Sequence, residues 1–495
     1  MAGVELGKDE AAYWYWSQHL DATYAALPLA AVALADAILP GHEWLLRLPS
    51  ALAGLLSLAL VHSLCREWGL SLRRCKWATA AFAASHWIWH TSSYLHPDGY
   101  LVPCWLLALW CAQRATQSHG DRWWAGAGIA AGLATLSKYS GGVLAAGMLA
   151  ALLMDGRPGR WRRLTTFALA AFLVASPLVV AQWRTGFFLP TTLGTLSRIA
   201  ADAAAPSRLL HLLSSPLFFV SPLLLLLLYF GLGQHVRRAW QSRALSDLAL
   251  TVPGVLLLGT FAFFALVHGQ VKGNWILPAF LGVWPLTFSL APSGVGWRRW
   301  YVPVLVVVGG LQTLGIALSL KYPQLPAQAG AWLGDDADAT YPRLVSPADQ
   351  VREPSATWTE RVCEYHGWRE LVPRLEAALG AHDVPRSTPI VSTQYAIPFG
   401  VAYYSPGRPV HTLDDPRFRF LADLTPTDSQ KLPSVVFISR GSIPPGWLPR
   451  THPHTQHLGT LSRTSPGCGE ETYRITLYTR DQGPMHGRKR ISAPD

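Results

Sequence analysis

Charged residues are scarce in this sequence. Asp, Glu, Lys and Arg make up 14% of its 495 residues, whereas a typical soluble domain has roughly 25%. Half of the residues are hydrophobic and 22 are Trp, a residue that gathers at headgroup level in membrane proteins. The composition therefore excludes an ordinary soluble protein and predicts a polytopic membrane protein.

The chain also lacks acidic residues to balance its basic ones, and its formal net charge is +11. An excess of this kind can indicate a nucleic-acid partner. Here, however, the arginines occupy short stretches between apolar runs, where they orient a membrane protein. We therefore expect a lipid bilayer as partner and no nucleic acid.

Several motifs that carry chemistry are missing. The sequence contains no GxxxxGK phosphate loop, no nucleophile elbow, no tandem repeat and no CxxC, so the enzyme classes that depend on them are not indicated. The HPHTQH stretch at 452–457 is expected to be a solvated loop. We assign no metal-ligating residues and no certain cofactor.

Ten apolar segments approach the ~20 residues that a helix needs to cross a bilayer. They cover residues 46–65, 77–94, 100–115, 123–137, 140–154, 164–183, 209–232, 248–267, 275–291 and 302–320. A shorter apolar segment, 25–39, contains Pro28 and Asp36 and is expected to be an interfacial helix. The expected fold class is thus an all-α polytopic membrane protein.

The basic residues also predict the orientation. One set of alternate loops carries fifteen Lys and Arg, from Arg66 to Arg299, and the other set carries seven, from Lys8 to Lys272. The positive-inside rule assigns the richer set to the cytoplasm. The N-terminal stretch, the loops that hold Asp98 and Lys138, and the C-terminal segment then lie on the exported side.

From residue 321 the sequence becomes charged and rich in Pro. Residues 368–379 have helical spacing, and 388–392, 435–439 and 473–479 read as strands. We expect an exported catalytic loop with interfacial helices (1–45), a transmembrane domain (46–320), a small exported α/β domain (321–482) and a disordered tail (483–495). Cys363 and Cys468 form an even pair in an oxidising compartment, which suggests a disulfide.

Two acidic sites lie beside the apolar segments, at Asp9–Glu10 and at Asp98. Carboxylates near a lipid boundary usually do chemistry or pair with another group. Other roles stay open, because Asp9 could cap a helix and Glu10 could be a first-turn helix acid. Asp98 could likewise start a helix, and Lys138 could only be snorkelling from a helix end.

Five motifs carry a family resemblance. They are LGKDEAAYWYWSQHL (6–20), LHPDGYLVPCWLLAL (95–109), GLATLSKYSGGVL (132–144), HGQVKGNWILPAFL (268–281) and YAIPFGVAYYSPGRP (395–409). In order and spacing they resemble the C-type (GT-C) membrane glycosyltransferases of the protein O-mannosyltransferase and lipid A aminoarabinose transferase group. Members usually have a transmembrane helix before the acidic pair, whereas only eight residues precede Asp9 here. We expect the natural gene to encode a further apolar helix upstream.

The resemblance implies a GT-C fold and an inverting glycosyltransferase of the bacterial inner membrane. It implies a polyprenyl-phosphate sugar donor, an acceptor that is a lipid, glycan or protein, and transfer on the periplasmic side. A divalent metal is compatible with it. The implied catalytic residues are Asp9, Glu10 and Asp98, the implied donor-phosphate ligands Lys138, Arg198 and Lys272, and the implied substrate-binding residues Tyr13, Trp14 and Asn274.

Three other functions compete with this one. A secondary transporter would place ionisable groups in mid-span and show internal repeats, and neither is found. A catalytically inactive scaffold that binds polyprenyl lipids would fit the absence of a first helix. A related oligosaccharide ligase or polymerase is the nearest rival among enzymes.

Overall fold

The computed structural model describes residues 4–19, 24–118, 120–185, 205–268, 272–290, 300–326, 328, 362–413, 424–465 and 467–480. It forms two compact units. The first comprises Met1–Tyr365 with Pro466–Cys468, and the second comprises His366–Ser465 with Gly469–Asp495. The boundary at His366 lies further along the chain than residue 321, where the sequence places the start of the second domain.

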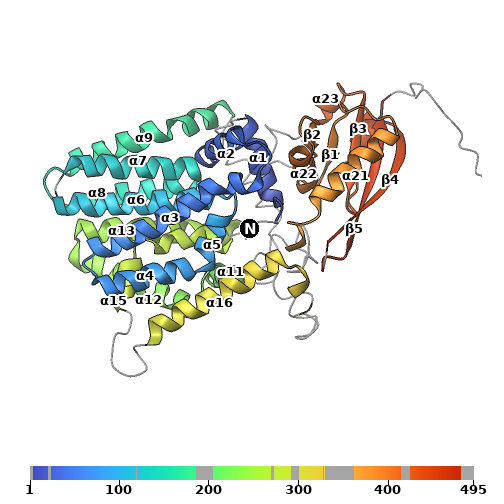
Figure 1. Ribbon diagram of the computed structural model, residues 1–495. Helices are drawn as coiled ribbons and strands as arrows, with labels where there is room; N and C mark the ends of the chain where they lie inside the picture. Colours follow the sequence, from blue (N-terminus) through green and yellow to red (C-terminus); the bar gives the residue numbers. More distant parts are fainter. Residues whose placement is uncertain are drawn as a thin grey trace, which may run out of the picture. The chain divides into compact units, whose positions relative to one another are not determined.

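The first unit is helical, and its long helices run alongside one another (Figure 1). Its elements are α1 (Lys8–His19), α2 (Ala26–Ile38), α3 (Glu43–Glu67), α4 (Leu72–Ala84), α5 (His86–Ser93), α6 (Pro97–Ser118), α7 (Asp121–Ser137), α8 (Ser140–Met154), α9 (Arg160–Arg184), α11 (Ala205–Ser214), η1 (Ser215–Phe218), α12 (Pro222–Ser242), α13 (Leu245–His268), α14 (Gly273–Ile276), η2 (Leu277–Phe280), α15 (Trp284–Leu290) and α16 (Tyr301–Lys321).

Four of the described helices are long and apolar enough to cross a membrane: α3, α9, α13 and α16. The expected interfacial segment is helical as α2. The count of ten spans stays a prediction.

Three expected spans are wrong as single helices. Span 77–94 is divided between α4 and α5, span 275–291 between α14, η2 and α15, and span 209–232 is divided as well. The chain there forms α11, the short 3-10 helix η1 and then α12. Proline favours the first turn of a helix, because its missing N–H has no intrahelical partner there. Pro222 takes this place in α12, and the Ser221 side chain caps the same helix by accepting from the Leu224 N–H. The apolar run is continuous, but these residues start a new helix inside it.

Helix α6 forms the centre of the first unit. Leu101, Leu106 and Leu109 on it are fully buried. Helix α7 packs against α9 through a close approach at Gly128, where an added Cβ would lie 2.4 Å from the Phe167 carbonyl oxygen. Small residues allow such contacts between membrane helices. α9 in turn leaves apolar side chains such as Phe172 exposed, as expected for a surface that faces lipid.

The second unit is a five-stranded sheet with helices. Its elements are α21 (Trp368–Ala381), β1 (Ile390–Ser392), α22 (Ala396–Tyr404), β2 (Val410–Thr412), α23 (Pro426–Ser429), β3 (Ser434–Ser439), α24 (Leu448–Thr451), β4 (His454–Thr464) and β5 (Glu470–Thr479). The strand order is β2-β1-β3-β5-β4. β1 is parallel to β2 and β3, and β5 is antiparallel to β3 and β4.

The predicted helix and the three predicted strands of this unit are confirmed as α21, β1, β3 and β5. The interpretation of 452–457 as a loop is wrong, because strand β4 begins at His454. Each residue from His454 to His457 is paired with a residue of β5. Two of the histidines that made this stretch look solvated thus belong to a paired strand.

A disulfide joins Cys363 to Cys468, with Cα atoms 5.6 Å apart, so the suggested pairing is confirmed. The residues beside Cys363 hold the N-terminal stretch of the same unit. The Glu5 N–H donates to the Tyr365 carbonyl (3.1 Å), and the Lys8 ammonium donates to the Glu364 carboxylate (2.8 Å). The segment before α1 is therefore attached to residues 362–365.

Candidate active site

Asp98 is the centre of the candidate site. It lies in the first turn of α6, and its side chain has no exposed surface. Its Oδ1 accepts a hydrogen bond from Lys138 Nζ (2.7 Å), and its Oδ2 accepts one from Asn274 Nδ2 (2.7 Å). Lys138 ends α7 and Asn274 lies in α14. Three predicted site residues from distant motifs are thus brought together, in charge-assisted bonds that fix their geometry.

His96 precedes this carboxylate in the chain and contacts it. The Asp98 N–H donates to His96 Nδ1 (3.2 Å), so this nitrogen carries a lone pair and the neutral ring holds its proton on Nε2. Burial lowers the pKa of His96 and outweighs the opposing carboxylate of Asp98. The imidazole is therefore neutral at neutral pH and can donate through Nε2.

A row of phenol rings continues from the imidazole. Tyr13 contacts the edge of His96, with ring centroids 6.5 Å apart, and the Tyr13 and Tyr24 hydroxyls are hydrogen-bonded to each other. The ring centroids of Tyr24 and Tyr139 are 5.4 Å apart. The Tyr139 hydroxyl accepts a hydrogen bond from Gln182 Nε2 (2.7 Å). Burial raises the pKa of Tyr13, so its hydroxyl stays uncharged. The row offers neutral donors and acceptors beside the charged cluster.

The two residues of the acidic pair have different surroundings. Asp9 is exposed, and it precedes Tyr13 by four positions on α1, so both lie on one face of that helix. The charge of Asp9 acts on Tyr13 and on His96. Asp9 thus belongs electrostatically to the cluster around Asp98, and its side chain is reachable from solvent.

Glu10 is buried, 2% exposed, and all four of its acceptor positions are used. Arg47 donates to it through Nε (2.8 Å) and through a terminal nitrogen (2.6 Å). The Leu95 and Gly7 N–H groups add bonds of 3.0 and 3.1 Å. Glu10 therefore links α1, α3 and the segment that leads to Asp98.

Arg47 also fixes the chain before α1. Its two terminal nitrogens donate to the Val4 and Glu5 carbonyl oxygens, each at 2.8 Å. Because the Glu10–Arg47 pair makes several hydrogen bonds to the backbone as well as its own ion pair, its contacts are those of residues that stabilise the fold.

The remaining predicted residues are more scattered. Lys272 is exposed and forms the N-cap position of α14, two residues before Asn274. Trp14 donates from its indole nitrogen to Asp36 Oδ2 (3.0 Å) and so ties α1 to α2. Arg198 lies outside the described residues.

Sequence reasoning missed His96, Tyr24, Tyr139 and Arg47 as members or supports of the site. Two of them had a usable signal: His96 stands two residues before Asp98, and Tyr139 follows Lys138 directly. Within the part of the chain that the structure describes, no three His, Cys, Asp or Glu residues converge as metal ligands.

Part of the chain matches a known family by sequence. Residues 26–183 match the family model described as dolichyl-phosphate-mannose-protein mannosyltransferase. A comparison with curated proteins by sequence finds no match.

Two solved structures resemble nearly the whole chain. The crystal structure of ArnT from Cupriavidus metallidurans in the apo state has a TM-score of 0.58 at 15% identity, over 96% of this chain and 94% of that one. The same protein bound to undecaprenyl phosphate has a TM-score of 0.55 at 15% identity, over 97% and 96%. The fold is shared, and the resemblance that the five sequence motifs carry is confirmed.

Proposed function

We propose that this chain, which has the C-type glycosyltransferase fold, moves a sugar from a polyprenyl-phosphate donor to an acceptor on the exported side of the bacterial inner membrane. The observation that carries the proposal is the convergence of Asp98, Lys138 and Asn274, with Asp9 and Tyr13 beside them. Ionisable residues that cluster at the ends of membrane segments mark a functional site. The structure of ArnT with undecaprenyl phosphate supports the class of donor.

The chemistry needs one base and several cations. The acceptor hydroxyl oxygen attacks the anomeric carbon, the bond from that carbon to the phosphate oxygen breaks, and the phosphate leaves with the electron pair. A phosphate leaves without the protonated carboxyl that glycoside hydrolysis requires. Asp9 would take the acceptor's proton, and the anomeric configuration would invert.

The cations would stabilise the departing phosphate, as fixed positive charges do where negative charge develops. Lys138 is held in place by Asp98, so its ammonium is already oriented for a phosphate oxygen. Lys272 and Arg198 are further candidates for this role. Asp98 would act mainly on the orientation of Lys138, and Asn274 and Tyr13 would contact the substrate.

The exported orientation rests on two independent features. Basic residues concentrate in one set of loops, and the Cys363–Cys468 disulfide is typical of an oxidising compartment. Alkaline phosphatase fused after Tyr322 should therefore be active, and the same enzyme fused after Arg243, just beyond α12, should be inactive. The reverse pattern would contradict catalysis on the exported side.

The function itself is tested in a deletion strain. Loss of the protein should make one polyprenyl-phosphate sugar accumulate and should remove the same sugar from one cell-envelope acceptor. Expression of the wild-type protein should restore the acceptor. If neither the lipid-linked sugars nor the envelope glycans change, the catalytic proposal fails and the inactive lipid-binding scaffold is favoured.

A further inference from the structure

Two hollows lie at the end of the first unit that is remote from Asp98. α3 begins beside the active-site cluster, where Arg47 holds Glu10, and α6 begins there with Asp98. Helices of 25 and 22 residues extend over about 33–37 Å. Near their far ends are cavities of about 350 and 380 Å³ that share Glu67 in their lining.

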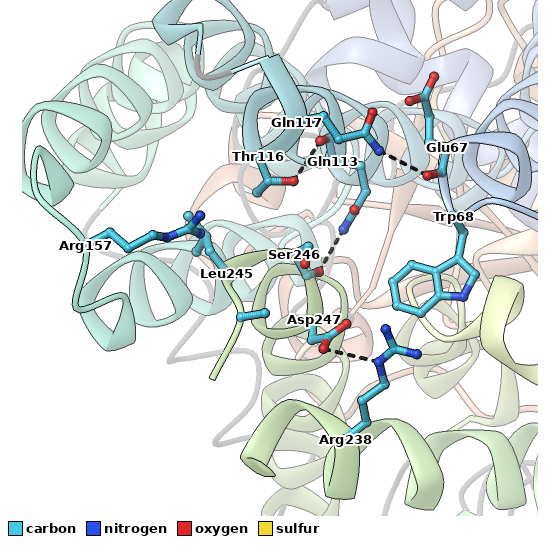
Figure 2. A pocket seen from close by; sticks show the side chains of 11 residues that line it. Glu67, Trp68, Gln113, Thr116, Gln117, Arg157, Arg238, Leu245, Ser246 and Asp247 are labelled. Atoms are coloured by element: carbon cyan, nitrogen blue, oxygen red, sulfur yellow. Dashed lines mark hydrogen bonds and ion pairs between the residues drawn. The ribbon is translucent and has the colours of Figure 1, made fainter. Parts of the chain in front are cut away.

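The first hollow, of about 350 Å³, is polar (Figure 2). Figure 2 shows Arg238 between Asp247 and the Trp68 indole, with Gln113, Thr116 and Gln117 on the neighbouring helix. Two of these amides are already bound, Gln113 to the Ser246 carbonyl (2.7 Å) and Gln117 to the Glu67 carbonyl (3.0 Å). The polar lining is therefore ordered before any ligand enters.

Each hollow has an exposed arginine anchored on a more buried carboxylate. In the first, Arg238 Nε lies 3.2 Å from Asp247 Oδ2, and the side chains are 55% and 3% exposed. In the second, Arg114 Nε lies 2.7 Å from Glu67 Oε1, with 44% and 14% exposed. In each pair the carboxylate is thus more buried than the guanidinium, so the charge that a ligand can reach is positive.

The anchoring uses the same nitrogen in both pairs. Nε makes each contact, and the terminal nitrogens of Arg114 and Arg238 make no hydrogen bond within the part of the chain that the structure describes. A guanidinium has five N–H donors in a planar fork that matches phosphate oxygens. Four of these donors on each arginine are available to a ligand.

An indole supports each guanidinium. Arg238 lies 4.8 Å from the ring centroid of Trp68, and Arg114 lies 5.3 Å from that of Trp110. Tryptophan at the ends of membrane helices belongs at headgroup depth. Both hollows adjoin α3, and the first also adjoins α13. These two helices are of membrane-crossing length, which puts both guanidinium groups at that depth.

We propose that these two hollows bind the phosphodiester headgroups of an anionic phospholipid from the membrane face opposite to the active site. The ligand chemistry is a phosphodiester held by the Arg114 and Arg238 forks, with Thr116 and Gln117 near its glycerol hydroxyls. Basic hollows between membrane helices are typical sites for anionic headgroups. This lipid would be structural and distinct from the polyprenyl-phosphate donor, so the inference does not depend on the proposed function.

The test measures thermal unfolding of the full-length protein in vesicles of pure phosphatidylcholine and in mixed vesicles with phosphatidylglycerol. We expect the mixed vesicles to raise the wild-type Tm by roughly 2–4 °C. Arg114→Gln combined with Arg238→Gln should remove this rise. The matched control is Arg73→Gln, an exposed arginine at the start of α4 that lies outside both hollows and should keep the rise.

A second pair of variants protects the test from misfolding, because removing an arginine leaves a carboxylate uncompensated. Glu67→Gln with Arg114→Gln, and Asp247→Asn with Arg238→Gln, remove both charges of one pair, and each should lose the part of the rise that comes from its own hollow. A wild-type Tm that does not respond to phosphatidylglycerol would overturn the proposal. So would an equal loss of the Tm rise in Arg73→Gln, because the rise would then come from the general positive charge of this face and not from the two hollows. An equal rise with inorganic phosphate in phosphatidylcholine vesicles would also overturn it, in favour of a free-anion site.

Discussion

Asp9→Asn should abolish sugar transfer and leave the protein folded. Asparagine keeps the size of the side chain but cannot accept the proton of the acceptor hydroxyl. General bases contribute typically ~10²–10⁴-fold, so single-turnover transfer should fall by at least the lower value. Asp9 is exposed on α1, and an exposed carboxylate is replaced by an amide at little cost in folding free energy.

The measurement compares transfer with donor binding and Tm for the same preparation. Donor binding should survive, because Lys138 and its partners Asp98 and Asn274 are unchanged. Near-wild-type transfer by Asp9→Asn would show that another group takes the proton. Unfolding of the variant would show that Asp9 is a structural helix residue.

Glu10→Gln, one position along, should instead unfold the protein. The change leaves Arg47 buried without a counter-charge, and breaking a buried pair costs about 3–5 kcal/mol. The side chains of the pair are only 3% and 6% exposed, so solvent screens little of this loss. A glutamine amide group would also face N–H donors from Arg47, Gly7 or Leu95, and two donors cannot bond each other.

A matched control is available in the same unit. Glu364→Gln breaks a partly exposed pair with Lys8, at 24% and 20% exposure, and such pairs contribute about 1 kcal/mol or less. We expect Glu10→Gln to lower the Tm in detergent far more than Glu364→Gln does. If Glu10→Gln keeps the wild-type Tm and loses only transfer, Glu10 takes part in the chemistry and the structural interpretation is wrong.

Sequence reasoning located the site through residues that end apolar segments on one side of the membrane. Asp98, Lys138 and Asn274 all come from motifs of this kind, and the structure brings them into direct contact. The sequence could not show that the two residues of the acidic pair, Asp9 and Glu10, have different surroundings. Successive residues of a helix point about 100° apart, so Asp9 reaches solvent while Glu10 turns inward, and only the partner Arg47 reveals which is which.

The errors in the fold have equally local causes. Hydropathy joined α11, η1 and α12 because the apolar run continues across Pro222, where a new helix starts. It missed β2 because only one of its three residues, Val410, is apolar. It missed β4 because this edge strand is mostly exposed and polar along its first half.

The attachment of the N-terminal stretch to residues 362–365 sets an order of events during synthesis. Lys8 and its partner Glu364 are 356 residues apart, which at ~5–20 residues per second corresponds to roughly 20–70 s on the ribosome. Throughout that time the segment carrying Asp9 has its contacts with α2, α3 and Leu95 but not those with residues 362–365. Closure of the covalent link must wait longer still, until Cys468 has been translated. A nascent chain released before residues 362–365 are translated would contain every proposed catalytic side chain and still lack the support that fixes the first of them.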